Sequence, residues 1–206
     1  FVESYKKLAA KVDYRMAKEN RKVLVITSVS ENEGKSTVAA NLAITLAEQS
    51  KKVLLIDGDI RRPSQFLILG MEPKDENELG EYLKGNGTFK DIIMTCPRKH
   101  MLFIGGKNCY STSTELLSSD SFSKLVKTCR KMVDYIIIDT PPIGLIGDAQ
   151  LFAHHADAVM IIARQNYMLA EDINEAIDDF RDDGNKVLGV ALNGVRTFSG
   201  LADSPV

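Results

Sequence analysis

The chain has 206 residues with 44% hydrophobic and 26% charged side chains, enough for one α/β domain with a sizeable core. A net charge of −2 and a pI of about 6.0 exclude a global basic field of the kind that favours nucleic acid. No run approaches the ~18 apolar residues of a membrane span, the N-terminus has no signal-peptide pattern, and three cysteines without C-x-x-C spacing predict reduced cytosolic thiols.

The first predicted element is a helix over residues 2–18, with an apolar stripe at three- and four-residue spacing. Two interpretations stay open, because such a helix either lies on its own domain or meets a partner. The stripe consists of Val2, Tyr5, Leu8, Val12 and Met16.

Apolar runs without alternation predict strands that are buried on both faces of a parallel sheet. The first run, 22–28, leads into a helix from Ser36 to Gln49. The second, 53–59, ends in two carboxylates, and the stretch 61–77 with its prolines and glycine is predicted to be a loop.

The rest of the chain continues to alternate helices and strands, which predicts one domain with a doubly wound, mainly parallel α/β sheet. Helix 1–20 is a candidate oligomer contact, 21–195 is the domain, and 196–206 is a flexible tail. The further predicted elements are helices at 79–83, at Phe89, Ile92 and Ile93, at 121–132 and at 171–182, strands at 101–104, 135–139, 158–163 and 186–192, and a polar loop at 107–114.

The stretch from Glu33 to Thr37 carries the strongest functional signal. It joins a strand to a helix, and a Gly-Lys-Ser/Thr turn in that position is the context of a phosphate-binding loop. Gly34 lets the backbone approach a phosphate, and the first N–H groups of the helix have no partner within it. Lys35 can reach the β- and γ-phosphates, and the Ser36 hydroxyl can bind Mg²⁺. The first glycine of the common pattern is replaced by Val29.

Carboxylates end two of the buried strands. Asp139 follows four apolar residues, the arrangement of a Walker B aspartate that holds a metal. Asp57 and Asp59 lie two apart, so an extended strand would place both on one face, where they repel unless a cation intervenes. One of them can serve Mg²⁺ while the other takes a proton from an attacking hydroxyl.

Other polar residues follow strand ends and allow more than one interpretation. Arg61 and Arg62 pair with carboxylates or phosphate, reach a neighbouring subunit, or are simply exposed. Asp148 and Arg164 are a candidate ion pair. The Asn193 amide is a candidate reader of the adenine edge, or a turn former before Gly194.

These motifs together resemble the bacterial protein-tyrosine kinases of capsule and exopolysaccharide synthesis (BY-kinases), which are similar to the MinD/ParA class of P-loop ATPases. The resemblance covers almost the whole chain. It rests on Gly34-Lys35-Ser36-Thr37 as Walker A, on residues 55–63 (LIDGDIRRP) as Walker A′ and on residues 136–142 (IIIDTPP) as Walker B. Residues 115–119, 147–149 and 188–193 also fit.

The resemblance implies ATP·Mg²⁺ binding and phosphoryl transfer to tyrosine, including autophosphorylation. Glu33 to Thr37 and Asn193 would bind ATP, Ser36, Asp59 and Asp139 would hold Mg²⁺, and Lys35, Asp57 and Asp59 would be catalytic, with Asp57 the preferred base.

The resemblance also implies partners. These are a transmembrane polysaccharide chain-length adaptor (or a fused membrane segment outside this chain), further copies of the chain, and a tyrosine phosphatase, at the inner face of the bacterial cell membrane. No nucleic acid is expected.

The chain departs from the family pattern in ways that keep two alternatives open. No tyrosine follows Tyr167, so the usual C-terminal acceptor cluster is missing, and the N-terminal Glu-x-x-Arg-x-x-Arg motif matches only at Glu3. One alternative is a MinD/ParA-like ATPase switch, although Ser30 stands where those proteins carry an extra lysine. The other is an ATP-binding partner without kinase activity.

Overall fold

The computed structural model describes residues 2–73, 78–96, 101–106, 116–117, 120–144 and 147–195. A seven-stranded sheet in the order β3-β4-β2-β5-β1-β6-β7 forms its centre, and every pairing is parallel except β3 with β4. The strands are β1 (Val23–Ser28), β2 (Val53–Asp57), β3 (Ile93–Cys96), β4 (Met101–Ile104), β5 (Tyr135–Asp139), β6 (Ala158–Arg164) and β7 (Val187–Asn193). The doubly wound, mainly parallel α/β fold is therefore confirmed.

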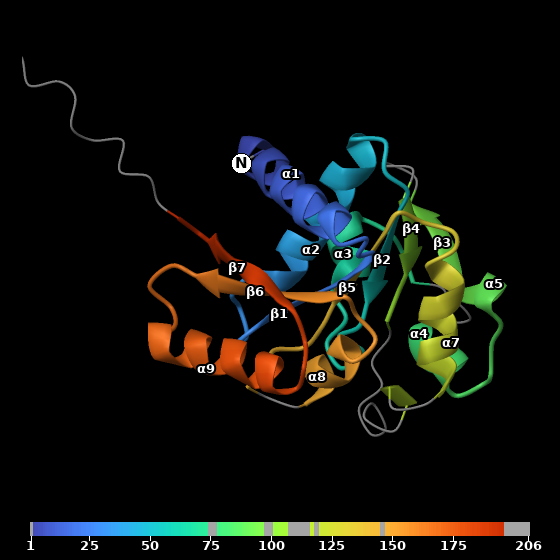
Figure 1. The fold of residues 1–206 in the computed structure, drawn as a ribbon. Helices are drawn as coiled ribbons and strands as arrows, with labels where there is room; N and C mark the ends of the chain where they lie inside the picture. Colours follow the sequence, from blue (N-terminus) through green and yellow to red (C-terminus); the bar gives the residue numbers. More distant parts are fainter. Residues whose placement is uncertain are drawn as a thin grey trace, which may run out of the picture.

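Helices cover both faces of the sheet (Figure 1). On one face lie α1 (Val2–Lys18), α2 (Lys35–Glu48) and α3 (Gln65–Leu69), and on the other α4 (Leu79–Leu83), α5 (Phe89–Ile92), α7 (Asp120–Cys129), α8 (Asp148–Ala153) and α9 (Ala170–Asp182).

Each central strand supplies side chains to both cores, as the unbroken apolar runs predict. In β1, Leu24 and Ile26 join the core under α1 and α2, whereas Val23 and Val25 join the core under α7, α8 and α9. No helix in the described part of the chain is both long and apolar enough to cross a lipid bilayer.

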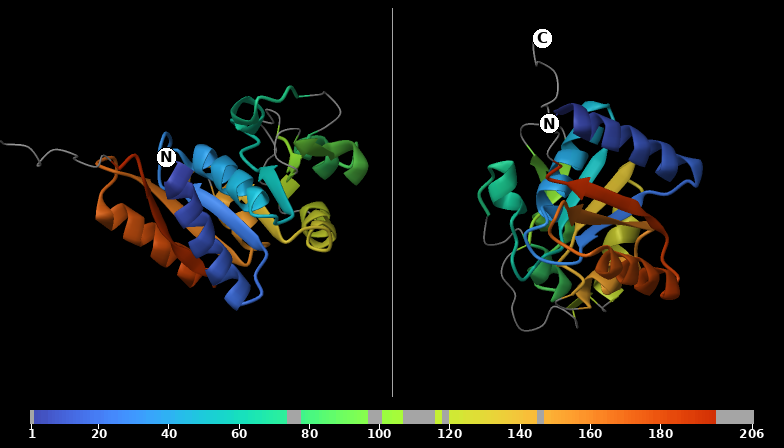
Figure 2. Two further views of the ribbon diagram at one scale, coloured as in Figure 1. Left: turned by 90° about the horizontal axis from the view of Figure 1, so that it is seen from above. Right: turned by 90° about the vertical axis from the view of Figure 1, so that its left-hand side faces the viewer.

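Helix α1 packs along the outer side of α2, as the turned views of Figure 2 show. Ala9, Val12 and Met16 are buried there, which favours the interpretation that α1 lies on its own domain. The predicted stripe is wrong at its first residue, since Val2 is 65% exposed. Residues 2–4 are all exposed, so the first turn of α1 is not packed against the domain.

Two local expectations were wrong, and one short helix was not predicted. Residues 61–77 are not all loop, because α3 forms between Ser64 and Gly70. Ile93 does not extend the helical piece at Phe89 but begins the antiparallel edge strand β3. Helix α8 was not expected at all, although its residues Ala149, Phe152 and Ala153 belong to the core. The predicted loop 107–114 and tail 196–206 lie outside the described residues.

Candidate functional site

The turn between β1 and α2, residues 29–34 (hereafter the phosphate loop), lies at the carboxyl edge of the sheet. Gly34 has a φ of 87°, a left-handed conformation that favours glycine. A Cβ at this position would lie 2.2 Å from the Asn193 amide nitrogen. No side chain caps the first turn of α2, so its N–H groups remain available for an anion.

Glu33 is 1% exposed and braces the phosphate loop from within. One carboxylate oxygen accepts the N–H of Ser30 at 2.7 Å, and the other accepts the N–H of Arg164, at the end of β6, at 3.1 Å. Its backbone carbonyl accepts the side-chain amide of Asn193, at the end of β7, at 2.9 Å. The carboxylate is thus engaged by backbone donors rather than directed at a ligand.

Glu31 and Asn32, which precede Glu33 in the phosphate loop, also have structural roles. The side chain of Glu31 pairs with Arg62. Asn32 has a φ of 62°, and its carbonyl accepts a hydrogen bond from the Arg164 guanidinium at 3.2 Å. Asparagine tolerates the left-handed conformation better than most residues, which explains its place in a loop that lacks the usual first glycine.

Asp57 and Asp139 end the neighbouring strands β2 and β5 in register with one another, and both are fully buried. One oxygen of Asp57 accepts the N–H groups of Ser64 and Gln65 at 3.1 and 2.9 Å. One oxygen of Asp139 accepts the Gln65 side-chain amide at 2.8 Å. The second oxygen of each aspartate has no hydrogen-bond partner among the described residues.

Burial raises the pKa of both carboxyls, and for Asp57 the charge of Asp139 raises it further. The N–H donors of Gln65 and Ser64 act against the shift at Asp57, and Lys35, Gln65 and Ser36 act against it at Asp139. Two buried like charges in adjacent strands therefore favour a cation beside them.

Lys35 is the cation that the site itself supplies. Its ammonium lies 3.1 Å from Asp59 and 3.4 Å from the Ser36 hydroxyl. Burial alone would lower the pKa of Lys35, but the charges of Asp139, Asp59 and Asp57 outweigh it and raise the pKa. The lysine therefore stays protonated and is held against the carboxylates.

These residues fit a Mg²⁺ ion bound together with a phosphate. Mg²⁺ prefers hard oxygen ligands and usually takes only one or two carboxylates from the protein. Ser36 and the free oxygen of Asp139 offer such ligands at the start of α2 and the end of β5. Within the described residues no three His, Cys, Asp or Glu side chains form a metal site alone, so phosphate oxygens would have to complete the shell.

Two predictions about which side chains lie together are wrong. Strand β2 ends at Asp57, so Asp59 does not share a strand face with it but sits in the following turn against Lys35. Asp148 does not pair with Arg164. It pairs instead with Arg61 at 3.0 Å, because α8 brings it under the turn after β2.

Arg62 pairs with Glu31, so both arginines of that turn bind carboxylates. Asn193 contacts the phosphate loop in the position described above, and Thr37 is exposed on the first turn of α2.

Sequence reasoning missed Gln65, which joins the site through its backbone and its amide. Its Nε2 donates to Asp139 and also to the Ser36 carbonyl at 3.0 Å. It lies in the segment 61–77, for which the sequence predicts a loop, and no motif marks it.

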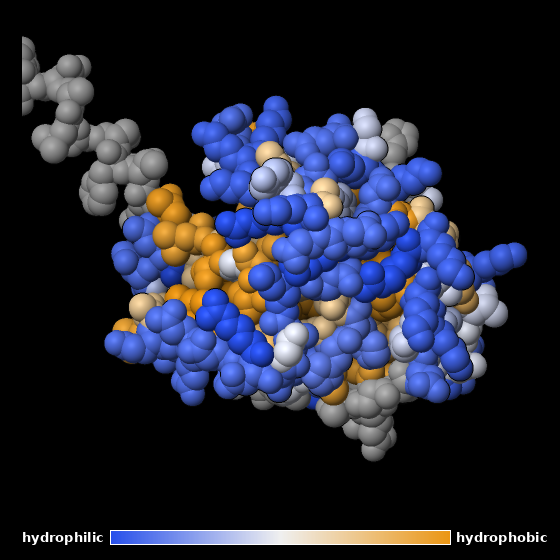
Figure 3. Space-filling view, in the orientation of Figure 1, coloured by the Kyte–Doolittle hydropathy of each residue, from blue (hydrophilic) through white to orange (hydrophobic). Residues whose placement is uncertain are grey.

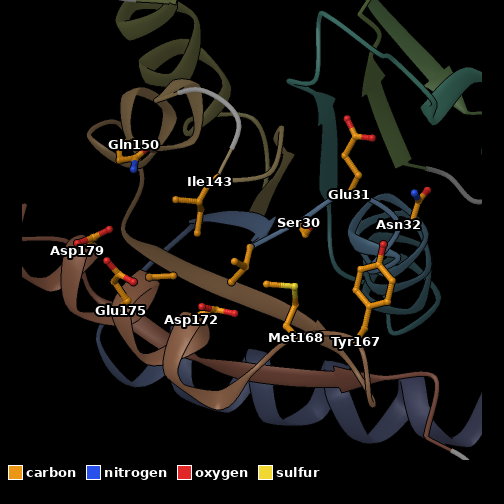
Figure 4. A pocket seen from close by; sticks show the side chains of 13 residues that line it. Ser30, Glu31, Asn32, Ile143, Gln150, Tyr167, Met168, Asp172, Glu175 and Asp179 are labelled. Atoms are coloured by element: carbon orange, nitrogen blue, oxygen red, sulfur yellow. The ribbon is translucent and has the colours of Figure 1, made fainter.

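A groove of about 780 Å³ adjoins the phosphate loop on the face that carries α8 and α9 (Figure 4). Residues 29–32 form one wall. Tyr167 and Met168, from the turn after β6, and three acidic residues of α9 form much of the rest. Those acidic residues are Asp172, Glu175 and Asp179.

Comparison with known proteins agrees with this geometry. A family profile described as an AAA domain matches residues 21–190. The tyrosine-protein kinase CpsD of Streptococcus agalactiae serotype III (strain NEM316) is 33% identical over 190 residues, which cover 91% of this chain and 80% of CpsD. The chain belongs to the bacterial tyrosine-protein kinase family.

Solved structures of other proteins share the fold of this kinase-family chain. The kinase domain of the Escherichia coli tyrosine kinase ETK superposes with a TM-score of 0.90 at 26% identity, covering 100% of this chain and 80% of that domain. MinD of Pyrococcus horikoshii OT3, complexed with Mg-ADP, superposes with a TM-score of 0.73 at 23% identity over 83% of this chain and 69% of MinD. MinD shares the P-loop nucleotide-binding fold.

Proposed function

We propose that the chain is an ATP- and Mg²⁺-dependent protein-tyrosine kinase that regulates capsular or exopolysaccharide synthesis and export. The observation that carries the proposal is the convergence of Lys35, Asp57, Asp59 and Asp139 beside the phosphate loop, in a chain whose relatives are named tyrosine-protein kinases. Bound ATP·Mg²⁺ would supply the phosphoryl group.

The residues have distinct roles in this proposal. Lys35 binds the β- and γ-phosphates once it leaves Asp59, and the N–H groups of the phosphate loop and of α2 hold the phosphates in place. Ser36, Asp59 and Asp139 provide the oxygens for Mg²⁺. Asn193 and Glu33 hold the phosphate loop in shape beside the nucleotide.

Asp57 is the proposed base for the tyrosine hydroxyl. One of its oxygens is fixed by two backbone N–H groups, and the other is free of hydrogen bonds within the described residues. Burial raises the pKa of Asp57 above its ordinary value, and a carboxylate with a raised pKa is a stronger proton acceptor than an ordinary aspartate.

The proposal includes partners of the kind that the family resemblance implies. These are a transmembrane chain-length adaptor or a membrane segment fused outside this chain, further copies of the chain, and a tyrosine phosphatase that reverses the reaction. The place of work would be the inner face of the bacterial cell membrane.

The deciding experiment incubates purified protein with ATP·Mg²⁺ and maps phosphotyrosine by mass spectrometry, beside Lys35→Ala. Lysine-dependent phosphotyrosine on the chain or on an added tyrosine-bearing polypeptide is expected. ATP turnover without phosphotyrosine would favour the MinD-like switch, for which the shared fold is the supporting observation. Binding of ATP without turnover would favour a non-catalytic nucleotide-binding partner.

A further inference from the structure

A single side-chain amide connects two of the residues that would hold Mg²⁺. The Gln65 amide nitrogen donates to Asp139 at 2.8 Å and to the backbone carbonyl of Ser36 at 3.0 Å. Asp139 ends β5 and Ser36 lies in the first turn of α2, so the amide links the sheet edge to the helix. The position of Gln65 therefore helps to fix where both of these ligands lie.

The partners of the Gln65 amide also decide which way it points. A backbone carbonyl and an ionised carboxylate only accept hydrogen bonds, so the amide nitrogen must face them and the amide oxygen must point elsewhere. That oxygen is buried, in a residue that is 0% exposed, and has no hydrogen-bond partner among the described residues. Covalent geometry keeps it within about 2.6 Å of the nitrogen, hence within about 5.4 Å of the Asp139 oxygen. An acceptor that lacks a donor therefore lies beside the proposed metal ligands.

Acceptors accumulate in this corner of the site. One oxygen each of Asp57, Asp139 and Gln65 is buried without a hydrogen-bond partner among the described residues. Buried polar atoms in folded proteins nearly all have partners, so a cluster of unpaired ones indicates that a ligand or an ion is bound there. Two of the three oxygens belong to carboxylates, which favour a cation. A hydrated Mg²⁺ supplies the cation and, in the waters that it keeps, the hydrogen-bond donors as well.

We propose that Gln65 is a positioning residue for Mg²⁺ in the nucleotide complex. Its amide nitrogen holds Asp139 and Ser36 in place as ligands, and its amide oxygen accepts a hydrogen bond from a water bound to the ion. This inference rests on the proposed binding of ATP·Mg²⁺ and adds a residue that lies outside the three Walker motifs. Hydrogen-bond partners orient metal ligands, and their loss commonly lowers metal affinity about 10- to 100-fold.

The backbone of Gln65 has a separate role that a side-chain substitution preserves. Its N–H donates to Asp57, the proposed base, at 2.9 Å. Any residue at this position except proline keeps that donor. A change of the side chain therefore tests the contacts with Asp139, Ser36 and Mg²⁺ while the hydrogen bond to Asp57 remains.

The test compares wild type with Gln65→Met, which keeps a long unbranched side chain and removes the amide. Calorimetry measures the binding of ADP, which excludes turnover, in EDTA and in excess Mg²⁺. We expect the Kd in EDTA to stay within about 2-fold of wild type, while the gain in affinity that Mg²⁺ confers falls about 10-fold or more. An unchanged gain would overturn this inference and leave the proposed kinase function standing.

Phe66→Leu is the matched control for a general loosening of α3. Phe66 is the next residue of that helix, is 8% exposed, and packs against Phe103 with 5.0 Å between the ring centres. This variant is expected to have a lower Tm and an unchanged gain in ADP affinity from Mg²⁺. An equal loss of that gain in Phe66→Leu and Gln65→Met would mean that Gln65 acts only by holding α3, and would overturn the inference.

A measurement on the wild type keeps the inference testable even when Gln65→Met does not fold. The NMR signal of the Gln65 side-chain amide, in isotope-labelled protein, is expected to shift when Mg²⁺ is added to the ADP complex. A signal that does not move would contradict a hydrogen bond from a metal-bound water. Loss of the Mg²⁺ gain in Gln65→Met, in a protein that forms no phosphotyrosine, would support this inference and overturn the kinase function alone.

Discussion

At the scale of single residues, Glu33 is the least ordinary feature of the site. A buried carboxylate next to a triphosphate would repel it, yet both oxygens of Glu33 accept backbone N–H groups. Buried polar groups in such bonds are costly to disturb, because the donors they leave behind lose their partners. We therefore regard Glu33 as a residue that positions the phosphate loop.

The first prediction concerns Glu33→Gln. The new amide would turn an NH₂ group toward one of the two N–H donors, so we expect a loss of about 1–3 kcal/mol in the free energy of unfolding and weaker ATP binding. Urea titration and a fluorescent ATP analogue measure the two effects. Glu31→Gln is the matched control, since its surface ion pair is worth less than ~1 kcal/mol. Tighter ATP binding by Glu33→Gln would show that repulsion, not bracing, dominates.

The second prediction concerns the ion pair between Lys35 and Asp59. Lys35 must leave Asp59 to bind phosphate, so Asp59→Asn should strengthen the binding of Mg²⁺-free ATP about 5-fold, roughly 1 kcal/mol. The added affinity that Mg²⁺ confers on the wild type should shrink. Equilibrium binding in EDTA and in excess Mg²⁺ measures both. Asp178→Asn, in an exposed ion pair on α9, is the control. Unchanged ATP binding by Asp59→Asn would contradict the idea that Lys35 exchanges Asp59 for phosphate.

The residues that bind or brace the phosphate loop differ in how far the sequence predicts them. Gly34, Lys35 and Ser36 follow from a local motif, and Asp139 follows from a strand that ends in a carboxylate. The contacts of Gln65 with Asp139 and of Arg61 with Asp148 cannot be predicted from a local motif. They span 74 and 87 residues and depend on how α3 and α8 pack.

At the scale of elements, the parallel pairing of β2 and β5 brings two site carboxylates together and also makes them repel each other. The register places Asp57 beside Asp139 at the buried edge. Backbone pairing fixes the strand positions, so the two carboxylates cannot separate to relieve their repulsion. The nucleotide-free fold therefore carries an unfavourable charge pair.

The third prediction follows from that pair. Because burial raises the folded pKa of Asp139 above its ordinary value of 3.8, the wild type loses stability as the pH rises from that value through the folded pKa, and the loss persists at pH 7. Asp139→Asn should raise the Tm of the nucleotide-free protein at pH 7 by about 2–4 °C, roughly 1 kcal/mol. It should also abolish stabilisation by ATP·Mg²⁺.

Calorimetry at pH 7 and near pH 4 checks this prediction, because the increase in Tm caused by Asp139→Asn should be smaller at the lower pH. Asp134→Asn, just before the other end of β5, is the control, because its carboxylate accepts the N–H of Lys52 at an exposed position. A lower Tm for Asp139→Asn at pH 7 would contradict the account.

Helix α1 is held to the rest of the domain by polar contacts as well as by its apolar face. Asp13 accepts the Tyr135 hydroxyl and pairs with Lys51 at 2.9 Å, and the Arg15 guanidinium donates to the Leu188 carbonyl of β7 at 2.5 Å. Met16 is fully buried beneath it. These contacts predict that α1 folds with the domain.

The fourth prediction is that Met16→Ala costs about 2–5 kcal/mol in the free energy of unfolding, the range for a large apolar side chain removed from a core. Denaturant unfolding measures it. Tyr14→Ala, two residues away and exposed, should stay within about 0.5 kcal/mol of wild type. Equal and small effects of the two changes would mean that α1 does not belong to the cooperative unit.

Long elements were predictable from periodicity, whereas short ones were not. The strand runs and helices α1, α2, α7 and α9 follow from apolar spacing within two or three residues of their observed ends. Helix α3 has five residues between Ser64 and Gly70, too few for a period to emerge. Strand β3 follows α5 without a turn, so only its pairing with β4 reveals it.

At the scale of the whole molecule, charge and apolar surface are unevenly distributed. Helix α1 carries five basic and two acidic residues, whereas residues 170–183 carry seven acidic residues and one basic residue. Between the two helices, the outer edge at β7 has an apolar patch that includes Val190, Leu192 and Val195 (Figure 3). A surface of this kind suits contact between copies.

The fifth prediction is that self-association of the chain weakens as salt rises. Opposite charges on separate copies attract over about 10 Å at 0.1 M salt and over about 3 Å at 1 M. Sedimentation velocity at low and high salt measures the change. Lys7→Glu, at an exposed position of α1, should mimic high salt, and association that grows with salt would indicate that the apolar patch dominates.

The contact between Asn193 and the phosphate loop has a consequence for the order in which the protein takes shape during synthesis. The loop emerges early from the ribosome, but the groups that close it arrive 131 residues later at Arg164 and 160 residues later at Asn193. Contacts so distant along the chain form late in folding. A partly synthesised chain therefore has the nucleotide motif without the contacts that brace it, and the proposed ATP site is not complete until β7 is in place.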